Sequence, residues 1–243
     1  MNIGGLGSPV RRLSTKALNL LAPQRCIYCD QTTDRIEAIC RFCCIAVQPN
    51  RTPCPRCALP DCRGSLCPAC QTRLPALQSV TAPYRYDVAV AYLVSLWKYR
   101  GERRLSDTIA RLMLQETDLR SDSDILLPTP LHWRRQLRRG FNQSDDLLRS
   151  LCAVQPQLKM ACAHRVRLSR QRSVSPQASS SRRERLRNLR GAFKVSGDLK
   201  GRSVTIIDDV CTTGATGNAI AATLLDAGAR EVHLWCFTRT PAR

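Results

Sequence analysis

The sequence predicts an α/β fold in which a parallel sheet follows a small cysteine-rich module. Eight cysteines in the first third of the chain form four Cys-x-x-Cys pairs, which predicts the module. Strand and helix patterns alternate after residue 78, an order typical of parallel sheets with right-handed crossovers. We therefore expect an amphipathic N-terminal segment at residues 1–23, the cysteine-rich module at 24–77 and the sheet domain at 78–243.

Length and apolar content exclude several classes of protein. The chain has 243 residues, of which 43% are hydrophobic, so disorder throughout is not expected. No stretch reaches the ~18 uncharged apolar residues that a membrane-spanning helix needs. The apolar run at residues 17–22 is shorter than the core of a secretory signal, and no small-residue cleavage site follows it. We therefore expect a cytoplasmic protein without a membrane span.

The cysteine pairs have the spacing of four-thiolate zinc sites. The first two pairs are separated by 10 residues and the last two by 9. Each Cys-x-x-Cys turn presents two thiolates to one ion, and tetrahedral zinc takes four such ligands. The predicted ligands are Cys26, Cys29, Cys40 and Cys43 for one site and Cys54, Cys57, Cys67 and Cys70 for the other. A disulfide framework and a single filled site stay open as alternatives, so one or two zinc ions are expected.

The expected role of zinc is structural. Residues 24–73 contain few large apolar side chains, and a module of that size does not fold without a metal or a crosslink. Four protein ligands leave no coordination position for a substrate, so hydrolysis at the metal is excluded.

Hydrophobic periodicity predicts the elements of the sheet domain in order. Alternation and β-branched residues begin at residues 78–83, which marks the expected domain boundary. Expected strands cover residues 79–86, 125–127, 204–207 and 232–237, and expected helices cover residues 88–99, 104–115, 144–151, 182–189 and 218–227. Residues 208–216, between the third strand and the last helix, are expected to be a loop.

Positive charge is concentrated in one quarter of the chain. Residues 131–190 hold 15 Lys and Arg against 3 acidic residues, an excess of 12 within a formal net charge of +19. Arginine makes up 33 of the 38 cations, and its planar fork suits bidentate contacts with phosphate. Such a surface is typical of nucleic-acid binding, although a small phosphorylated ligand or solubility alone would also account for it.

The clearest chemical pattern is at residues 204–216. Asp208 and Asp209 end a buried strand, and a loop of small and hydroxyl residues follows them at a helix N-terminus. Backbone amides and the helix dipole favour a phosphate there, Gly214 lets a ligand come close, and three threonines add hydroxyl donors. Adjacent acids suit paired ribose hydroxyls, directly or through Mg²⁺. The pattern therefore predicts a sugar-phosphate site.

This stretch resembles the phosphoribosyl-pyrophosphate signature of type I phosphoribosyltransferases, with four mostly apolar residues, two acids and a threonine-glycine loop. Further motifs narrow the resemblance to the ComF/GntX family, over residues 26–239. They include the cysteine pairs, the segment Leu126-Leu127-Pro128-Thr129-Pro130-Leu131 and the run Arg139-Gly140-Phe141-Asn142-Gln143. The resemblance implies a type I phosphoribosyltransferase-like parallel sheet domain preceded by a small double zinc ribbon.

The resemblance also implies a role for each residue of the site. Asp208 and Asp209 would hold the ribose hydroxyls of phosphoribosyl pyrophosphate, which would bind together with Mg²⁺. The 5-phosphate would lie on Thr212, Thr213, Gly214, Ala215 and Thr216. Pyrophosphate would lie on Pro128, Thr129 and Pro130, often through a strained or cis peptide, with Arg139, Asn142 and Gln143 beside it.

One position departs from the purine-salvage enzymes of this fold. The resemblance implies that in hypoxanthine-type enzymes an Asp, which acts as a base toward the purine, stands at the loop position of Thr212, whereas this chain has a hydroxyl with no evident activator. Purine salvage is therefore disfavoured, and no catalytic residue is assigned. Other members of the fold lack that Asp, so catalysis stays open. Residues 170–183 resemble the hood over such sites, and we expect them to be disordered without ligand.

Two functions are consistent with these features, and we favour the first. In the first, a ComF-like protein binds phosphoribosyl pyrophosphate and single-stranded DNA, and it supports DNA uptake in natural transformation or the use of DNA as a nutrient, with proteins of the uptake machinery as partners. Few aromatics accompany the basic residues, which weakens sequence-specific reading of DNA. In the second, an active phosphoribosyltransferase works in nucleotide or nucleobase metabolism. A zinc-stabilised adaptor with a vestigial site is a third alternative.

Overall fold

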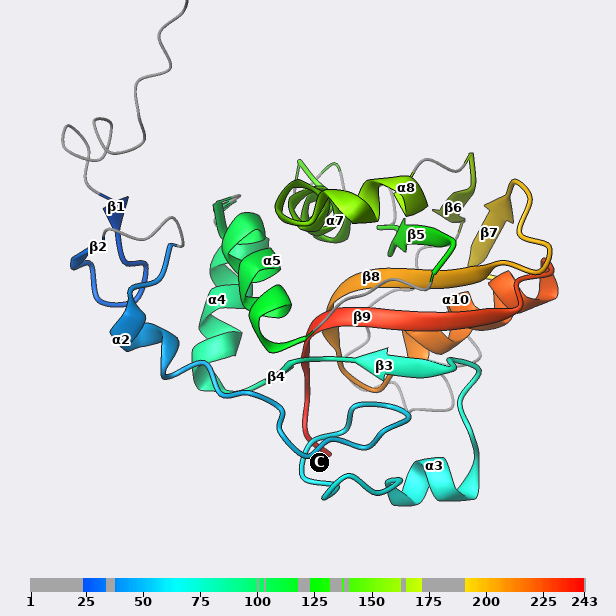
Figure 1. Cartoon of the computed structure of the whole chain (residues 1–243), viewed down its shortest axis with the longest axis horizontal. Coiled ribbons are helices and arrows are strands. Elements are labelled where there is room, and N and C mark those ends of the chain that lie inside the picture. Colours follow the sequence, from blue (N-terminus) through cyan, green and yellow to red (C-terminus); the bar gives the residue numbers. More distant parts are fainter. Residues whose placement is uncertain are drawn as a thin grey trace, which may run out of the picture.

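The computed structural model shows a layered domain with two cysteine-rich segments beside it (Figure 1). The residues that it describes are 24–33, 38–99, 101–102, 104–117, 123–131, 137, 140–162, 165–171 and 191–242. The expected N-terminal segment at residues 1–23, the expected helix at 182–189 and most of the expected hood lie outside the described residues.

A parallel sheet forms the centre of the domain, as the sequence predicts. Its strands run in the order β3, β9, β8, β5, and β4 also pairs in parallel with β9. The bounds are β3 Ser79–Thr81, β4 Tyr84–Arg85, β5 Ile125–Pro128, β8 Ser203–Cys211 and β9 Glu231–Arg239. The two long strands, β8 and β9, therefore lie in the middle of the sheet.

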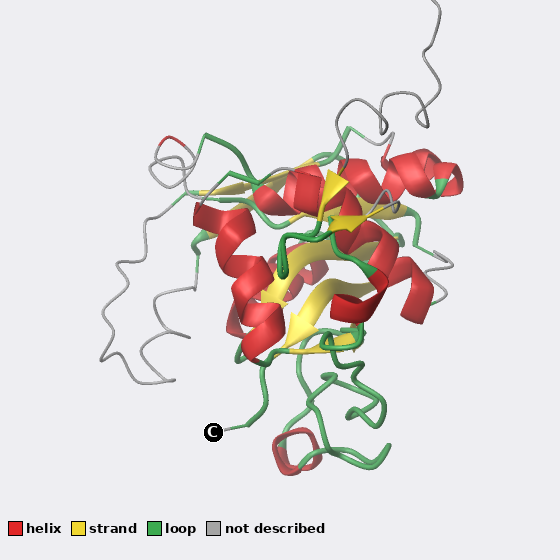
Figure 2. Ribbon diagram, turned by 90° about the vertical axis from the view of Figure 1, so that its left-hand side faces the viewer, coloured by secondary structure: helices red, strands yellow, loops and turns green. Residues whose placement is uncertain are grey.

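Helices cover both faces of this sheet (Figure 2). They are α4 Val88–Tyr99, α5 Arg104–Glu116, α7 Gln143–Val154, η1 Pro156–Leu158, α8 Lys159–Cys162 and α10 Ala215–Asp226. Leu126 belongs to the apolar cluster under α4, α5 and α7, whereas its neighbour Leu127 belongs to the cluster under α10. The domain thus has one core on each side of the sheet. None of the described helices is long and apolar enough to cross a membrane.

Some boundaries differ from the predicted ones. The predicted strand at residues 79–86 is two strands, because Pro83 has no N–H for the ladder, and its carbonyl accepts from the Asn50 N–H. The acid pair lies inside β8 and not in a loop, because β8 pairs with β9 as far as Cys211. The pattern also does not predict the hairpin of β6 (Arg167–Arg170) and β7 (Phe193–Ser196), where charged and polar residues interrupt the apolar ones.

The two cysteine-rich segments pack against different parts of the domain. The first contains β1 Gln24–Arg25, β2 Thr32–Thr33 and α2 Arg41–Cys44, and it lies beside α4 (Figure 1). Its Ala38 N–H donates to Thr108 Oγ1 of α5 over 2.9 Å. The second contains α3 Pro68–Thr72 and lies below β3 in the same view. Asn50 Nδ2 ties it to the sheet domain by donating to the carbonyls of Ala58 and Ala82.

Replacing Leu224 with Ala tests the core under α10. Leu224 is fully buried in that helix, so truncation leaves a cavity against the sheet. We expect the free energy of unfolding, measured in urea, to fall by about 2–5 kcal/mol. Asp226→Ala, an exposed change in the same helix, should alter it by less than about 0.5 kcal/mol. Equal effects of the two changes would contradict this packing.

Candidate functional site

The acid pair lies at the carboxyl end of β8, where its two side chains have different partners. Asp208 Oδ1 accepts from Ser144 Oγ of α7 over 3.2 Å and from the Asp209 N–H over 2.9 Å. Asp209 Oδ2 lies 2.6 Å from Nζ of Lys98, in the last turn of α4. Burial, and then the neighbouring charge of Asp209, raises the pKa of Asp208 to about 7. Asp208 therefore exchanges a proton near neutral pH.

The threonine loop, residues 212–216, follows β8 directly and begins α10. Gly214 is the N-cap of this helix and has a φ of 74°, a conformation that favours glycine. Thr212 and Thr213 are exposed, and the rest of the loop is half-buried. The Ala215 N–H donates to Thr213 Oγ1 over 3.3 Å. The acid pair and a helix N-terminus of small residues thus lie at the same end of the sheet, where the parallel strands have their carboxyl ends. This arrangement fits a ribose phosphate.

Arg239 holds the threonine loop in place through main-chain carbonyls. It is buried at the end of β9. Its Nη1 donates to the carbonyl of Cys211 over 3.1 Å and to that of Thr212. Its Nε donates over 3.0 Å to the carbonyl of Cys57, in the second cysteine-rich segment. One side chain therefore joins the loop to a cysteine turn, although no local sequence pattern marks it.

Asn218 makes a second connection between the same two regions. Its Nδ2 donates to the Gly214 carbonyl over 2.9 Å, and its Oδ1 accepts from the Leu77 N–H over 3.3 Å. The helix packs so closely here that a Cβ at Gly217 would lie 3.0 Å from Leu77 Cδ1. The start of α10 is therefore braced by the end of the second cysteine-rich segment.

Residues 128–131 form the other loop of the site, after β5. The Thr129 N–H donates to the Ile207 carbonyl over 2.8 Å, and the Thr129 carbonyl accepts from Asn142 Nδ2 over 3.1 Å. Thr129 Oγ1 is buried and has no hydrogen-bond partner among the described residues, so an oxygen atom of a ligand would satisfy it. No peptide bond among the described residues is cis, so the cis form suggested by the resemblance is wrong here.

The structure describes all but one of the other residues that were predicted for this loop. Asn142 caps α7 by accepting from the Ser144 N–H over 3.2 Å, which fixes its amide group against the loop. Gln143 is buried at the start of the same helix, Pro130 is buried and Pro128 is half-buried. Arg139 lies outside the described residues, so its place beside the loop stays a prediction.

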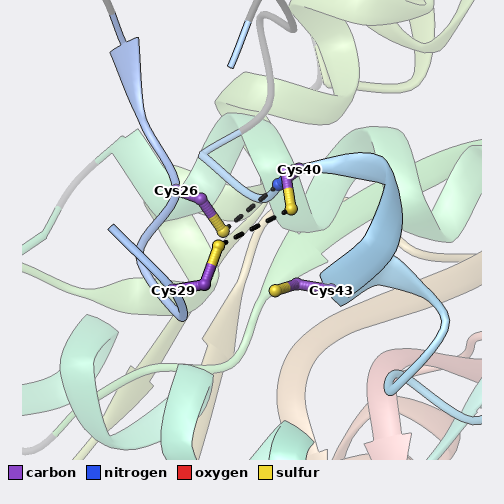
Figure 3. Close-up of side chains that lie close together, drawn as sticks. All are labelled: Cys26, Cys29, Cys40 and Cys43. Atoms are coloured by element: carbon purple, nitrogen blue, oxygen red, sulfur yellow. Dashed lines mark hydrogen bonds between the residues drawn. The ribbon is translucent and has the colours of Figure 1, made fainter. Parts of the chain in front are cut away.

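Each set of four cysteines gathers at one point. The four sulfurs of each set lie within 4.8 Å of one another, and Figure 3 shows the first set. Cys29 Sγ and Cys40 Sγ are 3.8 Å apart, and Cys57 Sγ and Cys67 Sγ are 3.6 Å apart. Thiolates at about 2.3 Å from one tetrahedral zinc ion would be about 3.8 Å from each other. Both sets therefore fit zinc, and their thiols are free and not in disulfides.

Backbone amides also point at the sulfurs. The Cys40 N–H donates to Cys26 Sγ over 3.3 Å, and the Cys67 N–H donates to Cys54 Sγ over 3.4 Å. Burial raises the pKa of both accepting thiols, but these and neighbouring amides together lower it to about 6 for Cys26 and about 7 for Cys54. Burial raises the pKa of other thiols in the same sets, to about 11 for Cys57 and further for Cys43 and Cys70, so binding of zinc would release protons from these thiols.

Known proteins are similar to this chain over most of its length. A family model described as "Phosphoribosyl transferase domain" matches residues 137–243. "DNA utilization protein YhgH" of Salmonella typhimurium is 36% identical over 214 residues, which cover 83% of this chain and 90% of the relative. "Competence protein F" of Haemophilus influenzae is 27% identical over 182 residues, which cover 71% of this chain and 78% of the relative.

A third relative and one solved structure complete the comparison. "Competence protein ComFC" of Streptococcus pneumoniae is 26% identical over 216 residues, which cover 88% of this chain and 87% of the relative. A purine phosphoribosyltransferase from Pyrococcus horikoshii matches 59% of this chain and 83% of its own with 14% identity. Its TM-score of 0.31 is too low to support an inference.

Zinc content tests the two sets of cysteines. Elemental analysis of the purified protein should find two zinc ions per chain. Cys54→Ser should lose one of them, because a neutral hydroxyl does not replace a thiolate ligand. Cys62→Ser, in the same segment but outside the set of four, should keep both. An unchanged zinc content in Cys54→Ser would contradict the second site.

Proposed function

Because this chain belongs to the ComF family of proteins with a phosphoribosyltransferase fold, we propose that it binds phosphoribosyl pyrophosphate with Mg²⁺ and handles single-stranded DNA. The names of its relatives, which refer to DNA utilization and competence, support DNA uptake or the use of DNA as the process it serves. The proposal therefore has two parts, a sugar-phosphate site and a DNA-binding surface.

The acid pair is the observation that carries the first part. Asp208 and Asp209 lie near the carboxyl end of β8, a central strand, and the threonine loop that begins α10 follows this strand. Carboxylate oxygens accept from hydroxyl donors and bind Mg²⁺, whereas the loop's amides and hydroxyls donate to phosphate. A ligand with a diol between two phosphorylated ends matches this arrangement. The buried hydroxyl of Thr129, for which the described part of the chain offers no partner, supports a second anionic group beside β5.

Charge supports the second part. The excess of 12 positive charges in residues 131–190 favours a polyanion, and phosphate contacts to a single strand need no sequence reading. Arg138 and Arg139, in this stretch, lie outside the described residues. Proteins of the DNA-uptake machinery are the proposed partners, because two relatives have competence names. Free thiols and cysteine metal sites support a reducing, cytoplasmic location.

Transfer of the phosphoribosyl group to a base is a second candidate function. One observation favours it: with a pKa of about 7, Asp208 is able to accept or donate a proton near neutral pH at the proposed ribose position. Thr212 counts against purine salvage, because a hydroxyl is a weak base where the purine-salvage enzymes use Asp. We therefore propose ligand binding first, and pyrophosphate release with a panel of bases would reveal transfer.

Isothermal titration calorimetry with phosphoribosyl pyrophosphate and Mg²⁺ tests the sugar-phosphate site. Asp208→Asn should bind about 10- to 100-fold more weakly than wild type, because a neutral amide replaces a charged acceptor. Wild-type affinity should fall as the pH drops below about 7, since Asp208 must then lose its proton to accept from a hydroxyl. Asp226→Asn, at the far end of α10, should bind normally. No binding by the wild type would overturn this part.

Fluorescence anisotropy with a labelled single-stranded oligonucleotide tests the DNA-binding surface. Affinity should fall steeply with added salt, because the protein displaces counterions from phosphates. Changing both Arg138 and Arg139 to Ala should weaken binding and reduce the slope of log K against log salt by about 1.4, since each phosphate contact to a single strand contributes about 0.7. Arg230→Ala, an exposed arginine just before β9, should change neither. Salt-insensitive or absent binding would remove DNA handling from the proposal.

A further inference from the structure

Lys98 and Asp209 form the most enclosed ion pair among the described residues. Lys98 Nζ lies 2.6 Å from Asp209 Oδ2, and the two side chains are 18% and 13% exposed. The side chains of the pair Arg25 and Asp30, by contrast, are 62% and 78% exposed. Exposed ion pairs contribute little to the stability of a protein, whereas removing the partner of an enclosed ammonium group destabilises it strongly. Lys98 is therefore firmly paired with an acid that the ligand is proposed to use.

The helix under Lys98 is fixed, but its side chain is long and flexible. The preceding residue, Trp97, is fully buried, and its Nε1 donates to Ser106 Oγ of α5 over 3.0 Å. Helix α4 lies at the end of the sheet where β9 ends (Figure 1). The position of the backbone is thus set by packing, while four methylene groups let the ammonium reach different anions nearby.

The proposed ligand and Lys98 compete for the same carboxylate. Asp209 has about four lone-pair directions, so an ammonium and a hydroxyl are able to share it. A divalent cation on the same carboxylate would repel the ammonium strongly, because little water separates them. A Mg²⁺ ion held by Asp209 would therefore displace Lys98 toward another anion, and the phosphates of the ligand would be the anions that arrive with it.

We propose that Lys98 changes partner when the ligand binds, from Asp209 in the free protein to the pyrophosphate group in the complex. The inference rests on the proposed function. The loop proposed for pyrophosphate follows β5, and Pro128 of β5 pairs with Ile207, directly before the acid pair. The two anions between which Lys98 would move are therefore on adjacent strands. Lys98 is in this view a ligand-binding residue.

This exchange makes the site selective for a pyrophosphorylated sugar. Ribose 5-phosphate offers the same diol and the same 5-phosphate, but it has no anion at the other end of the sugar to receive the displaced ammonium. Lys98 therefore opposes the binding of ribose 5-phosphate and favours that of phosphoribosyl pyrophosphate. A lysine with a purely structural role would affect both ligands alike, so their affinity ratio separates the two roles.

Calorimetry of two variants with two ligands tests the exchange. Lys98→Gln removes the charge but keeps a hydrogen-bond donor for Asp209, whereas Lys98→Arg keeps the charge. Each is titrated with phosphoribosyl pyrophosphate and with ribose 5-phosphate, both with Mg²⁺. The preference for the pyrophosphorylated sugar should fall at least about tenfold in Lys98→Gln, because a charge-assisted contact is lost, and by less than about threefold in Lys98→Arg.

The possible results are distinct. If Lys98→Gln loses the same factor in affinity for both ligands, the exchange is overturned and the proposed function stands. The same conclusion follows if the preference for the pyrophosphorylated sugar falls equally in Lys98→Gln and Lys98→Arg. Wild-type protein that binds neither ligand would overturn the proposed function and the exchange with it. If Lys98→Gln does not fold, the double variant with Asp209→Asn, which leaves no unpaired charge, should show the same fall in preference, and an unchanged preference would overturn the exchange.

Discussion

The parallel pairing of β8 with β9 decides where every part of the site lies. Its register runs from Ser203 opposite Glu231 to Cys211 opposite Arg239. This register brings the acid pair to the carboxyl end of the sheet and Arg239 next to the threonine loop. The main-chain groups of such buried strands find partners only in the ladder, and a slip of one residue would turn each side chain from the core on one face to the core on the other. The main-chain frame of the candidate site is therefore set by the middle of the sheet.

The two cysteine-rich segments support different sides of this site. The second reaches the threonine loop through the Cys57 carbonyl, which Arg239 holds, and through Leu77, which bonds to Asn218. The first packs on α5 through Ala38, close to the helix pair that presents Lys98. Metal in the second segment would thus do more than fold a small module, because that segment holds the threonine loop of the candidate site.

Local patterns predict most of the fold and part of the site. The apolar stretch of α4 and the acid pair with its threonine loop are continuous in the sequence, so periodicity and residue type are enough to find them. Lys98 and Arg239 escape such reasoning, because their importance comes from contacts with residues far away in the chain. The division of one predicted strand at Pro83 has a local cause in the missing N–H of proline, whereas the partner of the Pro83 carbonyl, the Asn50 N–H, comes from a distant part of the chain.

The contacts that Arg239 makes with Cys57, Cys211 and Thr212 all end on main-chain oxygens. A carbonyl is present whichever amino acid occupies a position, so mutational drift at these three sites leaves the arginine's partners intact as far as this contact is concerned. A substitution of Arg239 itself would lose these hydrogen bonds, because no other side chain has the same planar fork of donors. Any constraint on the side chains of Cys57 and Thr212 therefore comes from their own proposed roles in binding zinc and phosphate, and not from their contact with this arginine.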